Sequence, residues 1–111
     1  MTVTAKALLD GKQIEASQTT QYTADDVTAK ITKFTVTNTS SASADFSCNL
    51  VPNGGSASDT NLLVDARTIS AGETYICPEL VGHVLEDGDF ISTLASSASA
   101  LTVRISGFEI S

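Results

Sequence analysis

Residues Val27 to Thr39 have the sequence VTAKITKFTVTNT, in which apolar and polar side chains alternate and β-branched residues are frequent. Alternation with a period of two is typical of a strand that buries one face. A second run of this kind spans Ala44 to Pro52 (ADFSCNLVP). Its apolar side chains at alternate positions share one face: Phe46, Cys48 and Leu50. A short polar loop separates the two runs, and we therefore expect them to form a hairpin.

The strand pattern continues on both sides of these two runs. Further strands are expected over Val3–Leu9, Lys12–Ala16, Thr19–Thr23, Asn61–Ile69, Glu73–Cys77, Phe90–Ala95 and Leu101–Ile110. The first two flank Asp10-Gly11, a dipeptide that favours a two-residue hairpin turn. About eight strands, with turns roughly every eight to twelve residues, predict an all-β protein: an antiparallel β-sandwich or jelly roll.

The alternation slips by one residue at two places, before Phe34 and before Phe108. Such a slip turns every later side chain to the opposite face of the sheet. A β-bulge near Thr32-Lys33 and another at Ser106-Gly107 would restore the register. The alternative is a strand that crosses from one sheet to the other.

One segment between strands has helical spacing. In Pro78 to Leu85 (PELVGHVL) the apolar residues fall on one face of a helix: Leu80, Val81, Val84 and Leu85. Pro78 suits the first turn of a helix. Gly82 in the middle and the short length predict only one short helical turn.

The length of 111 residues predicts one domain, residues 1–111, with an N-terminal hairpin or arm over residues 1–18 and the main body over residues 19–111. Cys48 and Cys77 each lie in an apolar run. Two free thiols that pack as small hydrophobic groups, or one disulfide, both agree with this pattern.

Thirteen acidic and six basic residues give a net charge of −7. Proteins that bind nucleic acid or anionic lipid use clustered Lys and Arg. Here the basic residues are scattered singly, and Lys30 and Lys33 are the nearest to a pair. No apolar run approaches the roughly 20 residues of a membrane helix. We therefore expect neither a nucleic-acid partner nor a membrane partner.

No catalytic, cofactor-binding or metal-ligating constellation can be assembled from the sequence. His83 is the only histidine, and no nucleophile motif accompanies it. Three carboxylates crowd residues 86–89 without the spacing of a calcium loop. A glycan platform would need aromatic side chains, for which only Tyr22 and Tyr75 could serve. The pattern favours a non-enzymatic protein.

Two segments repeat a local formula in which a Gly-acid turn precedes an aromatic-plus-Ile strand start: residues 69–76 (ISAGETYI) and 85–91 (LEDGDFI). Together with residues 34–40 (FTVTNTS), 49–55 (NLVPNGG) and 78–85, they give the chain a pattern that resembles small structural proteins of tailed bacteriophages, over about residues 19–110. Within that group, size and acidity are similar to those of the capsid decoration (cement or staple) proteins of epsilon-type short-tailed phages.

The resemblance implies a virion protein that is made in the host cytoplasm and binds the exterior of the capsid. It would clamp neighbouring subunits of the major capsid protein, as a homo-oligomer, either a dimer or a trimer. Two alternatives stay open: a neck, tail or fibre-associated virion component, and a receptor- or glycan-binding β-sandwich module.

The N-terminal segment is the predicted contact with the shell or with a sister copy. Leu8 and Leu9 are consecutive apolar residues, and with Val3 they lie on a strand expected at the edge of a sheet. An edge strand offers unpaired backbone groups to a partner. The alternative is that Leu8 or Leu9 merely closes the core.

Overall fold

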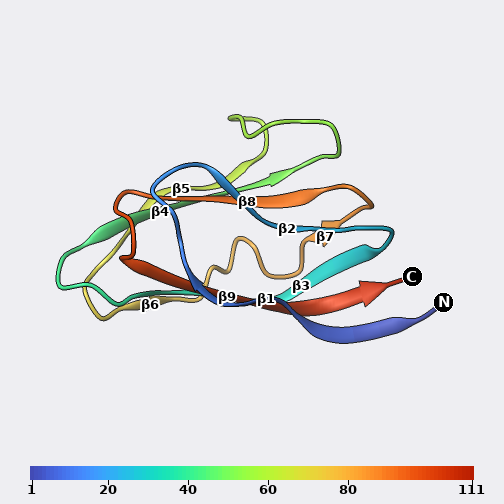
Figure 1. Ribbon diagram of the computed structural model, residues 1–111, viewed down its shortest axis with the longest axis horizontal. Coiled ribbons are helices and arrows are strands. Elements are labelled where there is room, and N and C mark those ends of the chain that lie inside the picture. Colours follow the sequence, from blue (N-terminus) through green and yellow to red (C-terminus); the bar gives the residue numbers. More distant parts are fainter.

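Runs of alternating apolar residues turn one face of each strand inward, and the chain builds two antiparallel sheets from them (Figure 1). The computed structural model describes residues 1–111 and contains nine strands and no helix. In chain order the strands are β1 (Val3–Gln13), β2 (Thr19–Thr23), β3 (Thr28–Asn38), β4 (Ala44–Val51), β5 (Leu62–Ile69), β6 (Thr74–Tyr75), β7 (Val84–Leu85), β8 (Phe90–Ala95) and β9 (Leu101–Ile110).

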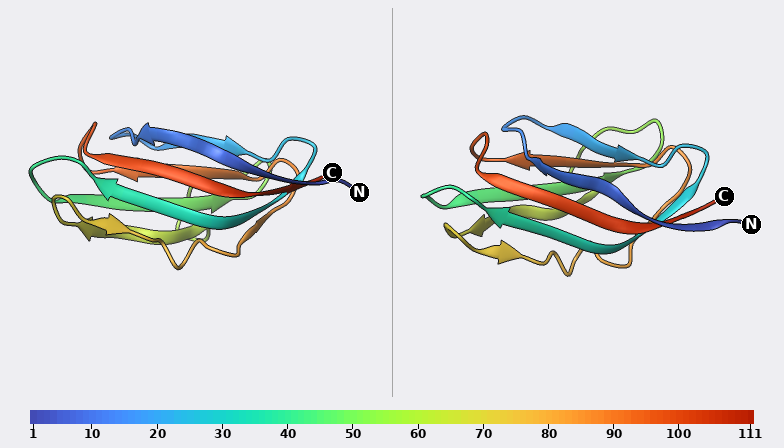
Figure 2. Two further views of the ribbon diagram at one scale, coloured as in Figure 1. Left: turned by 90° about the horizontal axis from the view of Figure 1, so that it is seen from below. Right: turned by 60° about the horizontal axis from the view of Figure 1, so that its bottom comes forward.

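The strands pair in the nested order of a jelly roll. Sheet A has the order β1-β9-β3-β6, and β7 also pairs with β3; sheet B has the order β2-β8-β4-β5. When β6 and β7 count as one interrupted strand, the first strand pairs with the last, the second with the one before it, and so inward to β4 and β5. The two layers face each other (Figure 2). The predicted all-β, antiparallel β-sandwich or jelly roll is confirmed.

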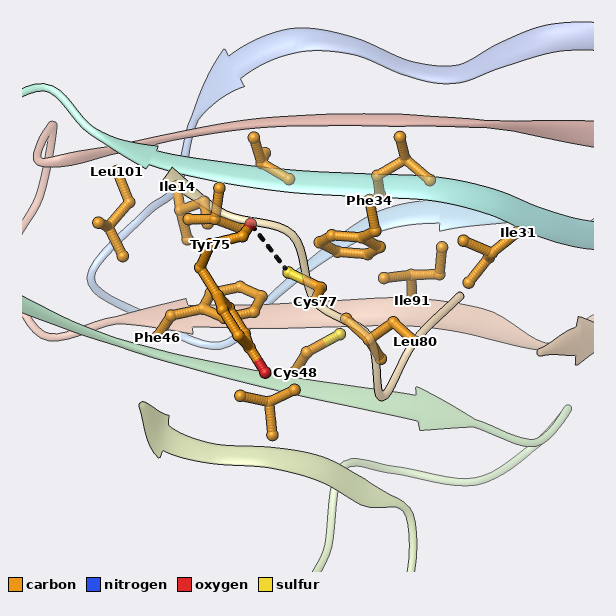
Figure 3. Packing of buried hydrophobic residues seen from close by; sticks show 14 of the residues in the cluster. Ile14, Ile31, Phe34, Phe46, Cys48, Tyr75, Cys77, Leu80, Ile91 and Leu101 are labelled. Carbon is orange, nitrogen blue, oxygen red and sulfur yellow. Dashed lines mark hydrogen bonds between the residues drawn. The ribbon is translucent and has the colours of Figure 1, made fainter. Parts of the chain in front are cut away.

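One hydrophobic core fills the space between the two sheets (Figure 3). Phe34 of β3 and Phe46 of β4 come from opposite layers, and their ring centroids lie 6.0 Å apart. Each large apolar side chain that is fully buried contributes roughly 1.5–3 kcal/mol relative to exposure. All of the buried apolar residues except Val51 belong to a single cluster that draws on both sheets, so the chain is one domain.

The predicted hairpin at Asp10-Gly11 is wrong. β1 passes through this dipeptide without turning and pairs with β9 on both sides of it, with the register shifted by one residue there. Long-range pairing with β9 therefore overrides the local turn preference, and the extra residue becomes a bulge. Leu8 and Ile14 lie in the core. Residues 1–18 are thus part of the sandwich and not a separate hairpin or arm.

The predicted hairpin between residues 27–39 and 44–52 is also wrong. β3 belongs to sheet A and β4 to sheet B, so the loop between them crosses from one layer to the other. Asn38 holds this crossing together, because its buried side-chain amide donates to the backbone oxygens of Ala42 and Ile69. The loop satisfies its polar groups through this side chain instead of through a ladder between the two strands.

The predicted β-bulge at Thr32-Lys33 is confirmed. The register of β3 against β9 shifts by one residue between Ile31 and Lys33, so that Thr32 has no partner of its own. The extra residue allows Ile31 and Phe34 to be buried together, although they stand three positions apart. β3 therefore remains in one sheet along its whole length.

The predicted bulge at Ser106-Gly107 within the last strand is wrong. β9 keeps one alternation over residues 101–107, with the odd-numbered residues buried. Phe108 and Ile110 consequently lie on the outer face of sheet A, where Phe108 is 39% exposed.

Residues Pro78–Leu85 do not form the predicted helical turn. Two successive hydrogen-bonded turns precede β7 instead, because backbone groups of this segment bond to β3. Leu80 and Leu85 are buried, whereas Val81 and Val84 are exposed, so the four apolar residues do not share a face.

Both cysteines are free thiols buried in the core. The Cys77 thiol donates to the backbone oxygen of Tyr75, with Sγ 3.6 Å from that oxygen (Figure 3). Burial raises the pKa of both thiols, that of Cys77 to about 12. Of the two alternatives that the sequence left open, the structure has the free thiols and no disulfide.

Gly107 is required by the close approach of β9 to the bulged part of β3. A Cβ atom at this position would lie 2.1 Å from the backbone oxygen of Lys30 and 3.0 Å from Leu8 Cδ1. A backbone oxygen in a sheet has little room to withdraw, so a side chain of any size would force the two strands apart.

Replacing Gly107 tests this close approach. We expect Gly107→Ala to lower the free energy of unfolding by about 3 kcal/mol, since one methyl group overpacks the β3–β9 interface. Gly11→Ala is the matched control, because a Cβ there meets no atom within 4 Å; it should change stability by less than about 0.5 kcal/mol. Urea titrations followed by circular dichroism measure both, and equal stabilities of the two variants would contradict the packing.

The buried thiols predict a marked difference in reactivity between folded and unfolded protein. Because the thiolate is the reactive form and burial raises the pKa of both groups, neither cysteine should react with a disulfide reagent at pH 8 in the native state. The same assay in denaturant, without reductant, should titrate both thiols of the chain. Detection of no free thiol after unfolding would show a disulfide instead.

Candidate interaction surface

Four apolar side chains gather on the outer face of sheet A, next to the two chain ends. Register places Ala5 of β1 beside Phe108 of β9, and Val3 of β1 beside Ile110 of β9. Side chains that stand directly opposite each other on one face of a sheet are in contact distance. We name these four residues the terminal patch.

The terminal patch is open to solvent. Val3 is 54% exposed and Phe108 is 39% exposed, whereas Ile110 is half-buried. β1 and β9 carry the patch toward the end of the molecule where both termini lie (Figure 1). Lys30 of β3 lies beside Phe108 and has the 50% exposed Val84 of β7 on its other side. Exposed apolar side chains that adjoin one another are typical of an interaction site.

Of the three residues predicted to contact a partner, only Val3 lies on this surface. Leu8 points inward and is 7% exposed, and Leu9 is partly buried against the core. Leu8 therefore closes the core, which was the alternative to its contacting a partner. The reason is the edge position of β1: one face of the strand must cover the interior, and Leu8 belongs to that face.

Phe108, Ile110 and Val84 were not predicted as surface residues. The sequence did carry a signal, because Phe108 and Ile110 are out of phase with the inward residues of the same strand. A phase change in a strand can come from a bulge, from a crossing to the other sheet, or from apolar residues on the outer face. The last cause applies here, because β9 stays in sheet A and keeps one alternation over residues 101–107.

The free edge of β1 borders the terminal patch. Thr2 and Ser111 exchange backbone hydrogen bonds, with N–O distances of 2.8 and 2.9 Å. At this end of β1, the backbone N–H and C=O groups of the even-numbered residues therefore point toward β9. The backbone groups of Val3 and Ala5 therefore point away from the sheet. β1 is an edge strand, as predicted, and its outer side has no neighbouring strand.

A polar cluster joins the two sheets behind the terminal patch. The Tyr22 hydroxyl of sheet B donates to Glu109 Oε2 over 2.5 Å, and Lys6 Nζ lies 3.3 Å from Glu109 Oε1. The hydrogen bond from Tyr22 lowers the pKa of Glu109, and Lys6 adds to the effect. Burial, reinforced by the bond to Glu109, raises the pKa of Tyr22. The cluster fixes the end of β9 against sheet B.

The largest hollow of the surface has a volume of about 350 Å³ and adjoins β7. Leu50, Leu63 and Val84 supply apolar walls, and His83 and Asp89 supply polar ones. No group of three His, Cys, Asp or Glu side chains is arranged to hold a metal ion. The structure has no helix of the length and apolar character needed to cross a membrane.

No protein-family model, curated protein or solved structure matches this chain.

The polar cluster predicts how stability depends on pH. Because the pKa of Glu109 is lower in the folded protein, its contribution to the free energy of unfolding is fully present above the unfolded-state value of about 4.3 and is lost as the pH falls through the lower, folded-state pKa. Glu109→Gln should therefore be less stable than wild type at pH 7, with the difference shrinking toward pH 3.

Thermal unfolding between pH 7 and pH 3 measures this difference. Glu86→Gln is the matched control, since it makes the same change of charge at an exposed carboxylate whose oxygens accept no hydrogen bond. A Glu109→Gln variant that followed the control across the whole range would show that the cluster contributes nothing to stability.

Proposed function

We propose that this chain is a non-enzymatic structural protein of a phage virion, and specifically a decoration protein that binds the capsid exterior and clamps subunits of the major capsid protein. The observation that carries the proposal is the terminal patch on a sandwich with a fully formed core of its own. An apolar surface that the fold does not need for its own core is suited to a partner.

The architecture supports a structural role on a capsid shell. Both layers are antiparallel sheets around one core, and viral capsid proteins are among those built as jelly rolls. A homo-oligomer that contacts several sites of one shell at once would hold by avidity even when each contact is weak. The net charge of −7 disfavours adhesion to the packaged DNA.

The proposal also includes the cellular and assembly context. The protein is made in the host cytoplasm, joins the shell as a homo-oligomer, and turns the outer face of sheet A toward the capsid. A neck, tail or fibre component is the alternative function among virion proteins. A receptor- or glycan-binding module is the alternative from another functional class, and binding to capsids distinguishes it from a decoration protein.

Binding to undecorated capsids tests the proposal. Wild-type protein should co-sediment with the shells and saturate at a fixed number of sites. Phe108→Ser should weaken binding about tenfold, because a buried aromatic anchor commonly contributes at least about 1.4 kcal/mol at an interface.

Leu94→Ser is the matched control, since Leu94 is a half-buried apolar residue of β8 that register places on the outer face of sheet B. Circular dichroism of both variants verifies that each is folded. If the wild-type protein binds host cells or glycans but neither capsids nor tails, it is a recognition module instead. Binding to purified tails in place of capsids would establish the neck or tail component.

A further inference from the structure

The outer face of sheet A is basic although the chain is acidic. Lys30, Lys33 and Arg104 lie on this face, since register pairs them with Phe108, Ser106 and Thr35, which also point outward. Arg104 forms an ion pair with Asp10 of β1, and no ion pair is formed by Lys30 or Lys33. Both lysines are exposed and lie beside or close to the terminal patch.

The bulge in β3 is what places both lysines on one face. Residues three positions apart in a regular strand point to opposite faces. The extra residue, Thr32, restores the phase, so that Lys30 and Lys33 both point outward while Ile31 and Phe34 both point inward. The bulge that brings Ile31 and Phe34 into the core therefore also places both lysines on the outer face.

The outer face of sheet B has the opposite charge. Asp59 and Asp65 border a hollow on this face, and Asp45 accepts a hydrogen bond from Thr68 there. Arg67 is the one basic residue of β5, and its guanidinium lies 4.3 Å from the centroid of the Tyr75 ring, between the layers. The sandwich therefore has one outer face with carboxylates, on sheet B, and one with ammonium groups, on sheet A.

We infer that Lys30 and Lys33 select and orient the partner of the terminal patch, and that this partner is a protein surface with an apolar spot flanked by carboxylates. The inference rests on the proposed function and names the chemistry that the capsid must present. Complementary charge at the rim of an apolar contact raises the association rate and disfavours wrong orientations. Presenting the acidic face of sheet B to the same carboxylates would be repulsive.

The mixture of groups favours a protein partner over a polyanion. Nucleic acids are held mainly by many basic side chains against phosphate. This face has only two unpaired lysines, and four apolar side chains adjoin them. Covering apolar side chains with other apolar groups is favourable, whereas covering them with phosphate is not.

Association kinetics on immobilised undecorated capsids test the inference. The double variant Lys30→Gln, Lys33→Gln should associate about tenfold more slowly than wild type at low salt. Raising NaCl from about 50 mM to about 500 mM should slow the wild type toward the rate of the variant, because salt screens the interaction.

The control variant Thr20→Glu, Ser56→Glu has the same net charge of −9, two charges more negative than the wild-type −7, but changes exposed residues on the side of sheet B. It should associate at the wild-type rate. If the two double variants are slowed equally, total charge is responsible and the inference is overturned while the proposed function stands.

Two further arms complete the experiment. If wild-type protein does not bind capsids at all, both the proposed function and the inference fail. Two polyanion probes are used separately: vesicles that contain anionic lipid, and a DNA duplex. Wild-type binding to either of them that is lost in the lysine variant would assign the basic pair to phosphate and overturn the protein partner.

Discussion

The contact between two backbones, at Gly107 of β9 and Lys30 of β3, is the constraint on which the rest of sheet A depends. The bulged segment of β3 occupies the space that a side chain at position 107 would fill. With that space available, β3 gains one residue and still keeps Ile31 and Phe34 in the core. The same adjustment leaves Phe108 and Lys30 side by side on the outer face of sheet A.

The strands themselves were largely predictable, because alternation is a local property of the sequence. The segments Thr19–Thr23, Phe90–Ala95 and Leu101–Ile110 have the predicted bounds. Their partners were not predictable in the same way. Asp10-Gly11 has strong turn preference, but β9 offers β1 a full ladder of hydrogen bonds, and the dipeptide is absorbed into that ladder. Local propensity therefore located the elements, while the nested pairing of a jelly roll, which joins residues far apart in the chain, decided which turns form.

The exposed residues of the terminal patch were predicted in part for a related reason. Val3 was identified because edge strands are natural contact sites, and it is exposed. Leu8 was identified as one of two consecutive apolar residues on the same edge strand, and apolar character does not distinguish an inward residue from an outward one until the register is known. Phe108 and Ile110 broke the alternation of their strand, and a bulge is the usual explanation of such a break. The burial pattern of β9, in which Gly107 keeps the inward position of the other odd-numbered residues, shows that the break lies in the chemistry of the outer face and not in the backbone.

The hydrogen bonds between Thr2 and Ser111 bring the two ends of the chain together (Figure 2). A short peptide linker can therefore close the molecule into a ring, and a circular permutant can open it again elsewhere. The exposed stretch around Gly54, which leads into the segment that lies over sheet B, is a suitable point. Cargo fused at such new termini would project away from the terminal patch, whereas a tag joined to Met1 or Ser111 would stand directly beside it.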